Sequence, residues 1–138
     1  MPAAKAIDAG VSAQRTVLVV EDVAPVRLLI ADIVRSFGYS VLEASNGEEA
    51  IRVIERSAVH IVLSDVYMPN APIDGLQLAH WVHGQRPGIK VILTSGVVSA
   101  VDPAYADFHE APLLQKPVRP QELERRLRSA LGDKAERR

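Results

Sequence analysis

The sequence contains no cysteine, few aromatic residues and no long apolar run. Without cysteine the chain has no disulfide framework, no thiolate metal site and no cysteine nucleophile. Sixteen basic side chains oppose seventeen acidic ones, which is not the positive excess of a polybasic nucleic-acid-binding protein. No apolar run approaches the roughly 20 residues of a membrane span, and residues 1–15 have no apolar stretch typical of a secretory signal. We therefore expect a cytoplasmic protein with neither a nucleic acid nor a membrane as its partner.

The length of 138 residues and the hydrophobic content of 48% fit one domain with an ordinary core. Residues 1–15 are rich in alanine and show no sustained periodicity, so we interpret them as a flexible N-terminal tail. The ordered pattern covers residues 16–132, and residues 133–138 form a short C-terminal tail. We see no internal repeat and no second domain.

Three apolar runs of strand length do not alternate with polar residues, which indicates strands buried on both faces, as in a parallel sheet. They are residues 16–20, 61–63 and 91–93, and weaker strands are predicted at 39–44 and 113–115.

Segments of helical period separate the strands. One apolar stripe before Gly38 has spacings of three and four: Val26, Leu29, Ile30, Ile33, Val34 and Phe37. The pairs Asn46–Glu49 and Asp74–Gln77 predict capping boxes at two further helices, and Pro120 begins the last one. Between residues 102 and 112 the helical signal is weak, about two turns. Strand and helix thus alternate five times, which predicts a doubly wound α/β fold with a parallel sheet and helices on both faces.

Polar residues follow the predicted strands where each one ends: Glu21 and Asp22, then Asp65, then Ser95, then Lys116. Ligands of open parallel sheets bind beyond the carboxyl ends of the strands, so we expect these side chains to converge. Three adjacent carboxylates repel one another unless a cation lies among them, and oxygen ligands alone favour Mg²⁺, or Mn²⁺, over zinc. A carboxylate beside such a cation, a lysine and a hydroxyl is suited to accepting a phosphoryl group.

Six stretches in this order resemble the receiver domain of two-component response regulators, over about residues 16–132: VLVVEDVAPVR, GYSVLEASNGEEAI, IVLSDVYMP, DGLQLA, KVILTSG and LLQKP. The resemblance implies the flavodoxin-like receiver fold, with five parallel strands in the order 2-1-3-4-5. It also implies phosphorelay signalling rather than enzymatic turnover, with at most Mg²⁺-dependent self-phosphorylation and slow loss of the phosphoryl group.

The family's functional residues carry over by position. Asp65 resembles the phosphoacceptor, and Glu21 and Asp22 resemble the acidic pair that holds Mg²⁺ together with Asp65 and the backbone carbonyl of Tyr67. Ser95 matches the switch hydroxyl and Lys116 the lysine that pairs with the phosphoryl group. The bond between Lys116 and Pro117 is usually cis in this family.

Three features depart from the family pattern. The loop after the acceptor has five residues, Asn70 to Asp74, where three are usual. Leu113 occupies a position that is usually aromatic in strongly switching members. Pro112 and Val118 replace the usual glycine before the fifth strand and the usual aromatic residue after the Lys-Pro pair.

Three other functions are known for folds or sites of this kind. A haloacid-dehalogenase phosphatase needs a second acid two residues after its nucleophile, where this chain has Tyr67. A flavodoxin-like flavin or nucleotide binder needs an anion-binding loop after the first strand, where this chain has Glu21 and Asp22. A docking module that keeps the receiver fold but works without phosphorylation stays the alternative.

The expected partners are a histidine kinase or a histidine phosphotransfer protein and a downstream protein, and the expected oligomeric state is a monomer or a weak homodimer. Only six residues follow Gly132, so we expect either a stand-alone receiver whose output passes through protein contacts, or a segment of a longer protein such as a hybrid histidine kinase. Two further clusters favour ordinary roles: packing or solvated histidines at His80 and His83, and a solvated basic face at Arg125, Arg126 and Arg128.

Overall fold

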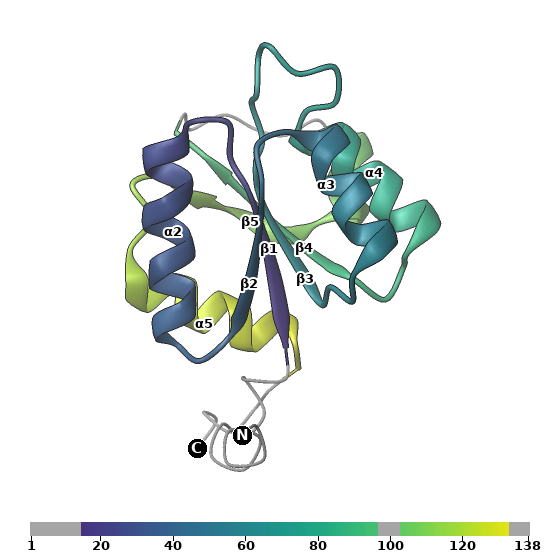
Figure 1. Cartoon of the computed structure of the whole chain (residues 1–138). Coiled ribbons are helices and arrows are strands. Elements are labelled where there is room, and N and C mark those ends of the chain that lie inside the picture. The colour runs from purple at the N-terminus through teal and green to yellow at the C-terminus, as the bar shows by residue number, and fades with distance from the viewer. Residues whose placement is uncertain (1–14, 97–102, 133–138) are drawn as a thin grey trace.

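A computed structural model describes residues 15–96 and 103–132 of the chain (Figure 1). Strands and helices alternate along it, as the sequence predicts. The elements are β1 (Thr16–Val20), α2 (Ala24–Ser36), β2 (Ser40–Ala44), α3 (Gly47–Arg56), β3 (Ile61–Asp65), α4 (Gly75–Gln85), β4 (Lys90–Ser95), the 3₁₀ helix η2 (Pro103–Phe108), β5 (Glu110–Gln115) and α5 (Pro120–Ala130).

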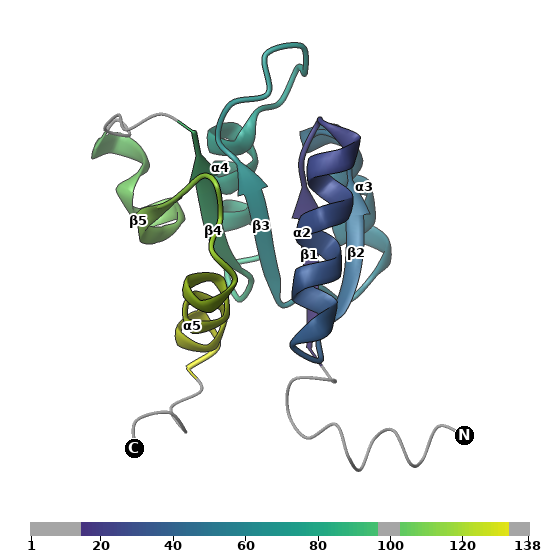
Figure 2. The same cartoon turned by 90° about the vertical axis from the view of Figure 1, so that its left-hand side faces the viewer.

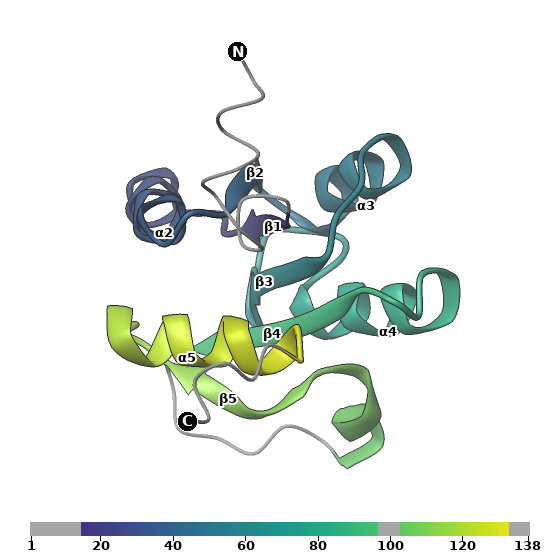
Figure 3. The same ribbon diagram turned by 90° about the horizontal axis from the view of Figure 1, so that it is seen from below.

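The five strands form one parallel sheet in the order β2-β1-β3-β4-β5. Helices α2 and α5 cover one face of the sheet, and α3 and α4 cover the other (Figures 1 and 3). The predicted fold class and strand order are therefore confirmed.

Each central strand contributes to two cores because its side chains alternate between the faces. In β1, Leu18 and Val20 pack with α3 and α4, whereas Val17 and Val19 pack with α2 and α5. Both sets are buried, which is why the sequence shows a continuous apolar run instead of an alternating one.

The apolar stripe of α2 is predicted correctly except at one position. Ile30 and Val34 are buried against the sheet, and Gly38 ends the helical segment with a φ of 100° that glycine adopts without strain. Leu29, however, is 60% exposed, so its placement in the buried stripe is wrong. The buried face of α2 is narrower than the periodicity suggests.

Capping side chains accept hydrogen bonds from backbone amides in the first turns of α3 and α4. At α4 the Asp74 carboxylate accepts from the Gln77 amide and the Gln77 side chain accepts from the Asp74 amide, each at 2.9 Å, so this capping box is complete. At α3 the Asn46 side chain accepts from the Glu49 amide at 2.8 Å, but the Glu49 carboxylate accepts from the amide and hydroxyl of Ser45 instead. The capping box predicted for Asn46 and Glu49 is therefore only half formed.

The connection from β4 to β5 differs most from a regular α/β unit. Its described part forms the six-residue 3₁₀ helix η2 in place of the weakly indicated helix. The Phe108 ring stacks on His80 of α4 at 4.7 Å between ring centroids and lies 4.8 Å from His83, so both histidines are packing residues. Residues 97–102, the first part of this connection, lie outside the described residues, as do 1–14 and 133–138 of the predicted tails.

Arg126 corrects the prediction of a solvated basic face on α5. Its side chain is buried and donates hydrogen bonds to the backbone oxygens of Pro112 at 2.6 Å and Glu110 at 3.3 Å. Both carbonyls belong to the part of β5 whose register with β4 is irregular, and the guanidinium links that part of the strand to α5. Within the described residues, no helix combines the length and the apolar character needed to cross a membrane.

Candidate functional site

The polar residues singled out in the sequence meet at the carboxyl edge of the sheet. Glu21 and Asp22 directly follow β1, Asp65 ends β3, and Lys116 directly follows β5. Oxygen atoms of the three carboxylates all lie within 4.8 Å of one another. The strands are parallel and in register, so residues far apart in the sequence reach the same edge.

Lys116 joins two of these carboxylates. Its Nζ donates to Oε1 of Glu21 at 2.8 Å and to Oδ2 of Asp65 at 3.0 Å. Burial disfavours the charged form of this lysine, but the hydrogen bonds and negative charges of Glu21 and Asp65 outweigh that cost and raise its pKa above the ordinary value. Lys116 is therefore a cation at every physiological pH, held beside Asp65.

The three carboxylates differ in their surroundings. Glu21 is only 2% exposed, and its second oxygen, Oε2, accepts from the Val23 amide at 3.2 Å. The Asp65 side chain is 12% exposed, while Asp22 faces solvent. The group of four side chains contains three carboxylates and one ammonium. It therefore has an excess of negative charge that a divalent cation would balance.

The donor set fits a hard divalent cation. It consists of carboxylate oxygens, with neither histidine nor cysteine, and one of its members is open to solvent. Mg²⁺ prefers such ligands and usually keeps several waters, which the exposed position of Asp22 allows. The residues that could hold the ion are Glu21, Asp22 and Asp65.

Two further predicted residues lie at the same edge. Ser95 ends β4 and is buried, and its backbone oxygen accepts from the Lys116 amide at 2.9 Å. Tyr67 lies two residues after Asp65, on the loop that rises above the strand ends in Figure 2, and its side chain is exposed. The metal-binding role of the Tyr67 carbonyl and the switch role of Ser95 stay predictions. The peptide bond between Lys116 and Pro117 is cis, as the resemblance implies.

Sequence reasoning missed two residues that shape the site. A Cβ atom on Gly75 would lie 2.1 Å from the backbone oxygen of Asp65, so only glycine lets α4 begin this close to Asp65. Arg27 of α2 donates from Nη1 to the backbone oxygen of Glu21 at 2.8 Å. Both lie inside the motif stretches, but neither directly follows a predicted strand, and that position is the feature by which the sequence indicates site residues.

The sequence matches the family model of the response regulator receiver domain over residues 17–128. Among curated proteins, the sensor kinase CckA of Brucella abortus is 43% identical over 87 residues, which are 62% of this chain and 9% of CckA. The transcriptional regulatory protein PdtaR of Mycobacterium tuberculosis is 35% identical over 89 residues, which are 64% of this chain and 42% of PdtaR. The chain thus spans less than half the length of these relatives.

The solved structures include a similar fold in the receiver domain of NtrX from Brucella abortus. The TM-score is 0.76 at 26% sequence identity, and the match covers 84% of this chain and 98% of the NtrX domain. The similarity therefore extends over a whole receiver domain.

Proposed function

Since this chain belongs to the response regulator receiver domain family, we propose that Asp65 accepts a phosphoryl group from a phosphohistidine of a two-component relay. The observation that carries the proposal is the position of Lys116, whose ammonium touches Asp65 in a pocket with two further carboxylates. The family signals and does not turn over a substrate, and we assign the chain that role.

In the proposed reaction a carboxylate oxygen of Asp65 forms a bond to phosphorus while the P–N bond of the donor breaks. The ring nitrogen leaves with the bonding electrons and takes up a proton from water. Lys116 already lies 3.0 Å from the Asp65 carboxylate, so its positive charge is in place to pair with a phosphoryl oxygen. Ser95, at the end of the neighbouring strand, is the proposed donor to another phosphoryl oxygen.

Glu21, Asp22, Asp65 and the carbonyl of Tyr67 are the proposed ligands of Mg²⁺, with Mn²⁺ as a substitute. When bound, the cation supplies positive charge that offsets the charge of the phosphoryl oxygens. Glu21 is held by Lys116 and by the Val23 amide, so the exposed Asp22 is the acid that is freer to turn toward an ion.

The proposed docking face for the phosphodonor lies beside this pocket. The large apolar side chains that are exposed in the described residues are Val23, Leu28, Leu29 and Tyr67, from the β1–α2 connection, α2 and the loop after Asp65. Leu29 also lines an apolar groove of about 420 Å³ that α2 forms with the segment after β5. Lys116 lines this groove and also contacts Asp65, so the groove is continuous with the acceptor site. A helix that carries the phosphohistidine and has an apolar side fits such a surface. For this role we propose a cytoplasmic location.

The test is the intact mass of the chain after treatment with a small phosphodonor, with and without Mg²⁺. We expect one added phosphoryl group that requires Mg²⁺, is lost in Asp65→Asn and is retained in Asp107→Asn, which changes an exposed acid of η2. Undiminished phosphorylation of Asp65→Asn would refute the assignment. Absence of any phosphorylation in the folded wild type would favour the alternative, a docking module that works without phosphorylation.

A further inference from the structure

We propose that Arg27 is a positioning residue for divalent cation binding, because its guanidinium fixes the backbone from which the side chains of Glu21 and Asp22 project. The inference rests on the proposed function, in which these two acids hold Mg²⁺. It assigns to α2 a part in building the acceptor pocket.

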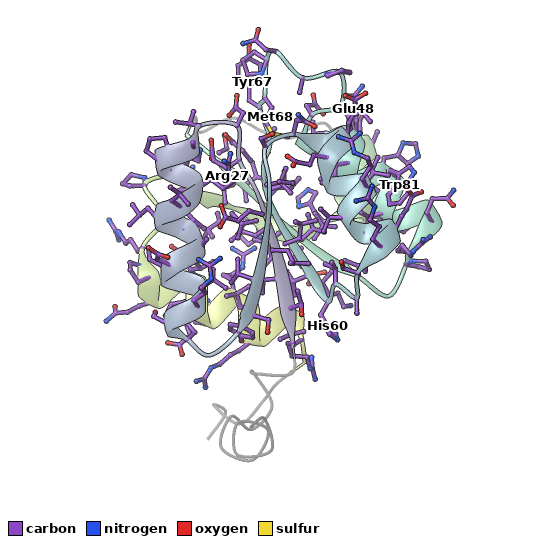
Figure 4. The ribbon with its side chains drawn as sticks, in the orientation of Figure 1. Arg27, Glu48, His60, Tyr67, Met68 and Trp81 are labelled. Carbon is purple, nitrogen blue, oxygen red and sulfur yellow. The ribbon has the colours of Figure 1, made fainter. Side chains whose placement is uncertain are left out.

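Arg27 connects three elements with one side chain. From α2, its Nη1 donates to the backbone oxygen of Glu21 at 2.8 Å, and its Nε donates to Oε1 of Glu43 in β2 at 3.3 Å. The side chain is 19% exposed and points from α2 toward the sheet (Figure 4). The guanidinium is rigid and planar, and with both Nη1 and Nε hydrogen-bonded it has little freedom to move.

The Glu21 carbonyl is the place where the backbone leaves the sheet. Pairing of β1 ends at Val20, and the Glu21 amide still donates to the Ala44 oxygen at 3.1 Å. The Glu21 carbonyl belongs to the peptide plane that ends at the Cα of Asp22. The hydrogen bond from Arg27 to this carbonyl therefore sets the orientation of that plane. The direction of the Asp22 side chain depends on it.

The turn that follows is closed by further contacts. Oε2 of Glu21 accepts from the Val23 amide at 3.2 Å, and the Val23 oxygen accepts from the Arg27 amide at 2.9 Å. The segment from Glu21 to Arg27 is thereby held by its own side chains and by the first turn of α2. Loss of the guanidinium would free the carbonyl at the centre of this arrangement.

Arg27 forms an ion pair with Glu43, which compensates its charge. Glu43 also accepts a hydrogen bond from Nη2 of Arg35 at 3.3 Å. Arg27 could affect metal binding through its charge or by positioning the acids, and the two explanations predict opposite effects of its removal. If Arg27 acted only through its charge, its removal would strengthen Mg²⁺ binding, since a cation near the pocket repels another cation. If Arg27 positions the acids, its removal weakens Mg²⁺ binding.

The experiment measures the Kd for Mg²⁺ by calorimetric titration of the full chain at constant ionic strength. We expect Arg27→Met to raise the Kd roughly tenfold, as befits a lost hydrogen bond from a charged donor. Arg27→Lys keeps the charge but contacts fewer acceptors, so its Kd should lie between those of the wild type and Arg27→Met. If Arg27→Met does not fold, Arg27→Gln takes its place with the same expected direction.

Arg35→Met is the matched control. It removes an arginine of the same helix that also pairs with Glu43, and the contacts of Arg35 in the structure are to Asp32 and Glu43, not to Glu21. Its Kd should equal that of the wild type. An unchanged or lower Kd in Arg27→Met, or an equal loss in Arg35→Met, would overturn the positioning role. A folded wild type that binds no Mg²⁺ would instead refute the proposed function.

Discussion

Replacement of Lys116 by methionine would remove the cation that joins Glu21 and Asp65 while keeping a side chain of similar length. In the wild type, Nζ lies 2.8 Å from Glu21 and 3.0 Å from Asp65. The variant leaves the buried Glu21 carboxylate without its ammonium partner and next to two other acids. Folding must then bury a charge that nothing in this group of side chains offsets.

Loss of one partner from a buried ion pair costs about 3–5 kcal/mol of the free energy of unfolding. Since 23% of the Lys116 side chain is exposed, water screens part of the interaction, and we expect the lower end, about 3 kcal/mol. For a domain of this size that corresponds to a decrease in Tm of roughly 10 °C.

Mg²⁺ should reduce this deficit. A ligand that binds only the folded state stabilises it by about 2.7 kcal/mol at a hundredfold excess over Kd. In Lys116→Met the pocket is more negative and contains no ammonium to repel the ion, so its Kd for Mg²⁺ should be lower than that of the wild type. At equal Mg²⁺ concentration the variant therefore gains more stability than the wild type.

The assay is urea-induced unfolding of both proteins with and without Mg²⁺, monitored by circular dichroism. Lys90→Met is the control, because Lys90 is exposed at the start of β4 and has no ion pair within residues 15–96 and 103–132. We expect it to unfold like the wild type. A Lys116→Met variant that loses less than about 1 kcal/mol, the value of a surface pair, or a deficit that Mg²⁺ leaves unchanged, would refute the reasoning.

Three more predictions follow from single contacts. Gly75→Ala should lower the free energy of unfolding by about 1–3 kcal/mol and slow phosphorylation, because the new Cβ displaces the Asp65 backbone. The amide and hydroxyl of Ser45 lower the pKa of Glu49, so Glu49→Gln should destabilise the protein above pH ~4.3. That difference should vanish as the pH falls through the lowered folded-state pKa, in denaturation measured from pH 6 to 3. Arg126→Met should cost about 1–3 kcal/mol, as measured by urea unfolding, because the β5 carbonyls of Pro112 and Glu110 lose the guanidinium as their donor.

The sheet could be predicted from the sequence because its three central strands, β1, β3 and β4, are buried on both faces. A continuous apolar run such as residues 16–20 has few other ways to fold in a chain that also shows helical periods between such runs. Leu29 of α2 is exposed although it lies in the apolar stripe, since periodicity shows which face of a helix is apolar but not how much of that face the sheet covers. The exposed remainder lies on the proposed docking face.

Residues of β5 and α5 show a second limit. The sequence predicts a strand over 113–115, whereas β5 begins at Glu110, pairs with β4 in an irregular register and has carbonyls that accept hydrogen bonds from the buried Arg126. Arg126 stands in the sequence beside two other arginines, and nothing in that local pattern distinguishes a buried guanidinium from an exposed one. Its role depends on carbonyl groups from another element, and only the tertiary structure brings these within reach.

Glu21, Asp65 and Lys116 were predictable for a reason that does not depend on the loops. A parallel sheet forces the carboxyl ends of its strands to one edge, so residues 95 positions apart meet there regardless of how the connections are built. Arg27 and Gly75 act on the same edge from helices, and their effect depends on helix position to within a fraction of an ångström. The chemistry of the pocket is therefore encoded in strand ends, while its geometry is encoded in the helix starts that hold those ends in place.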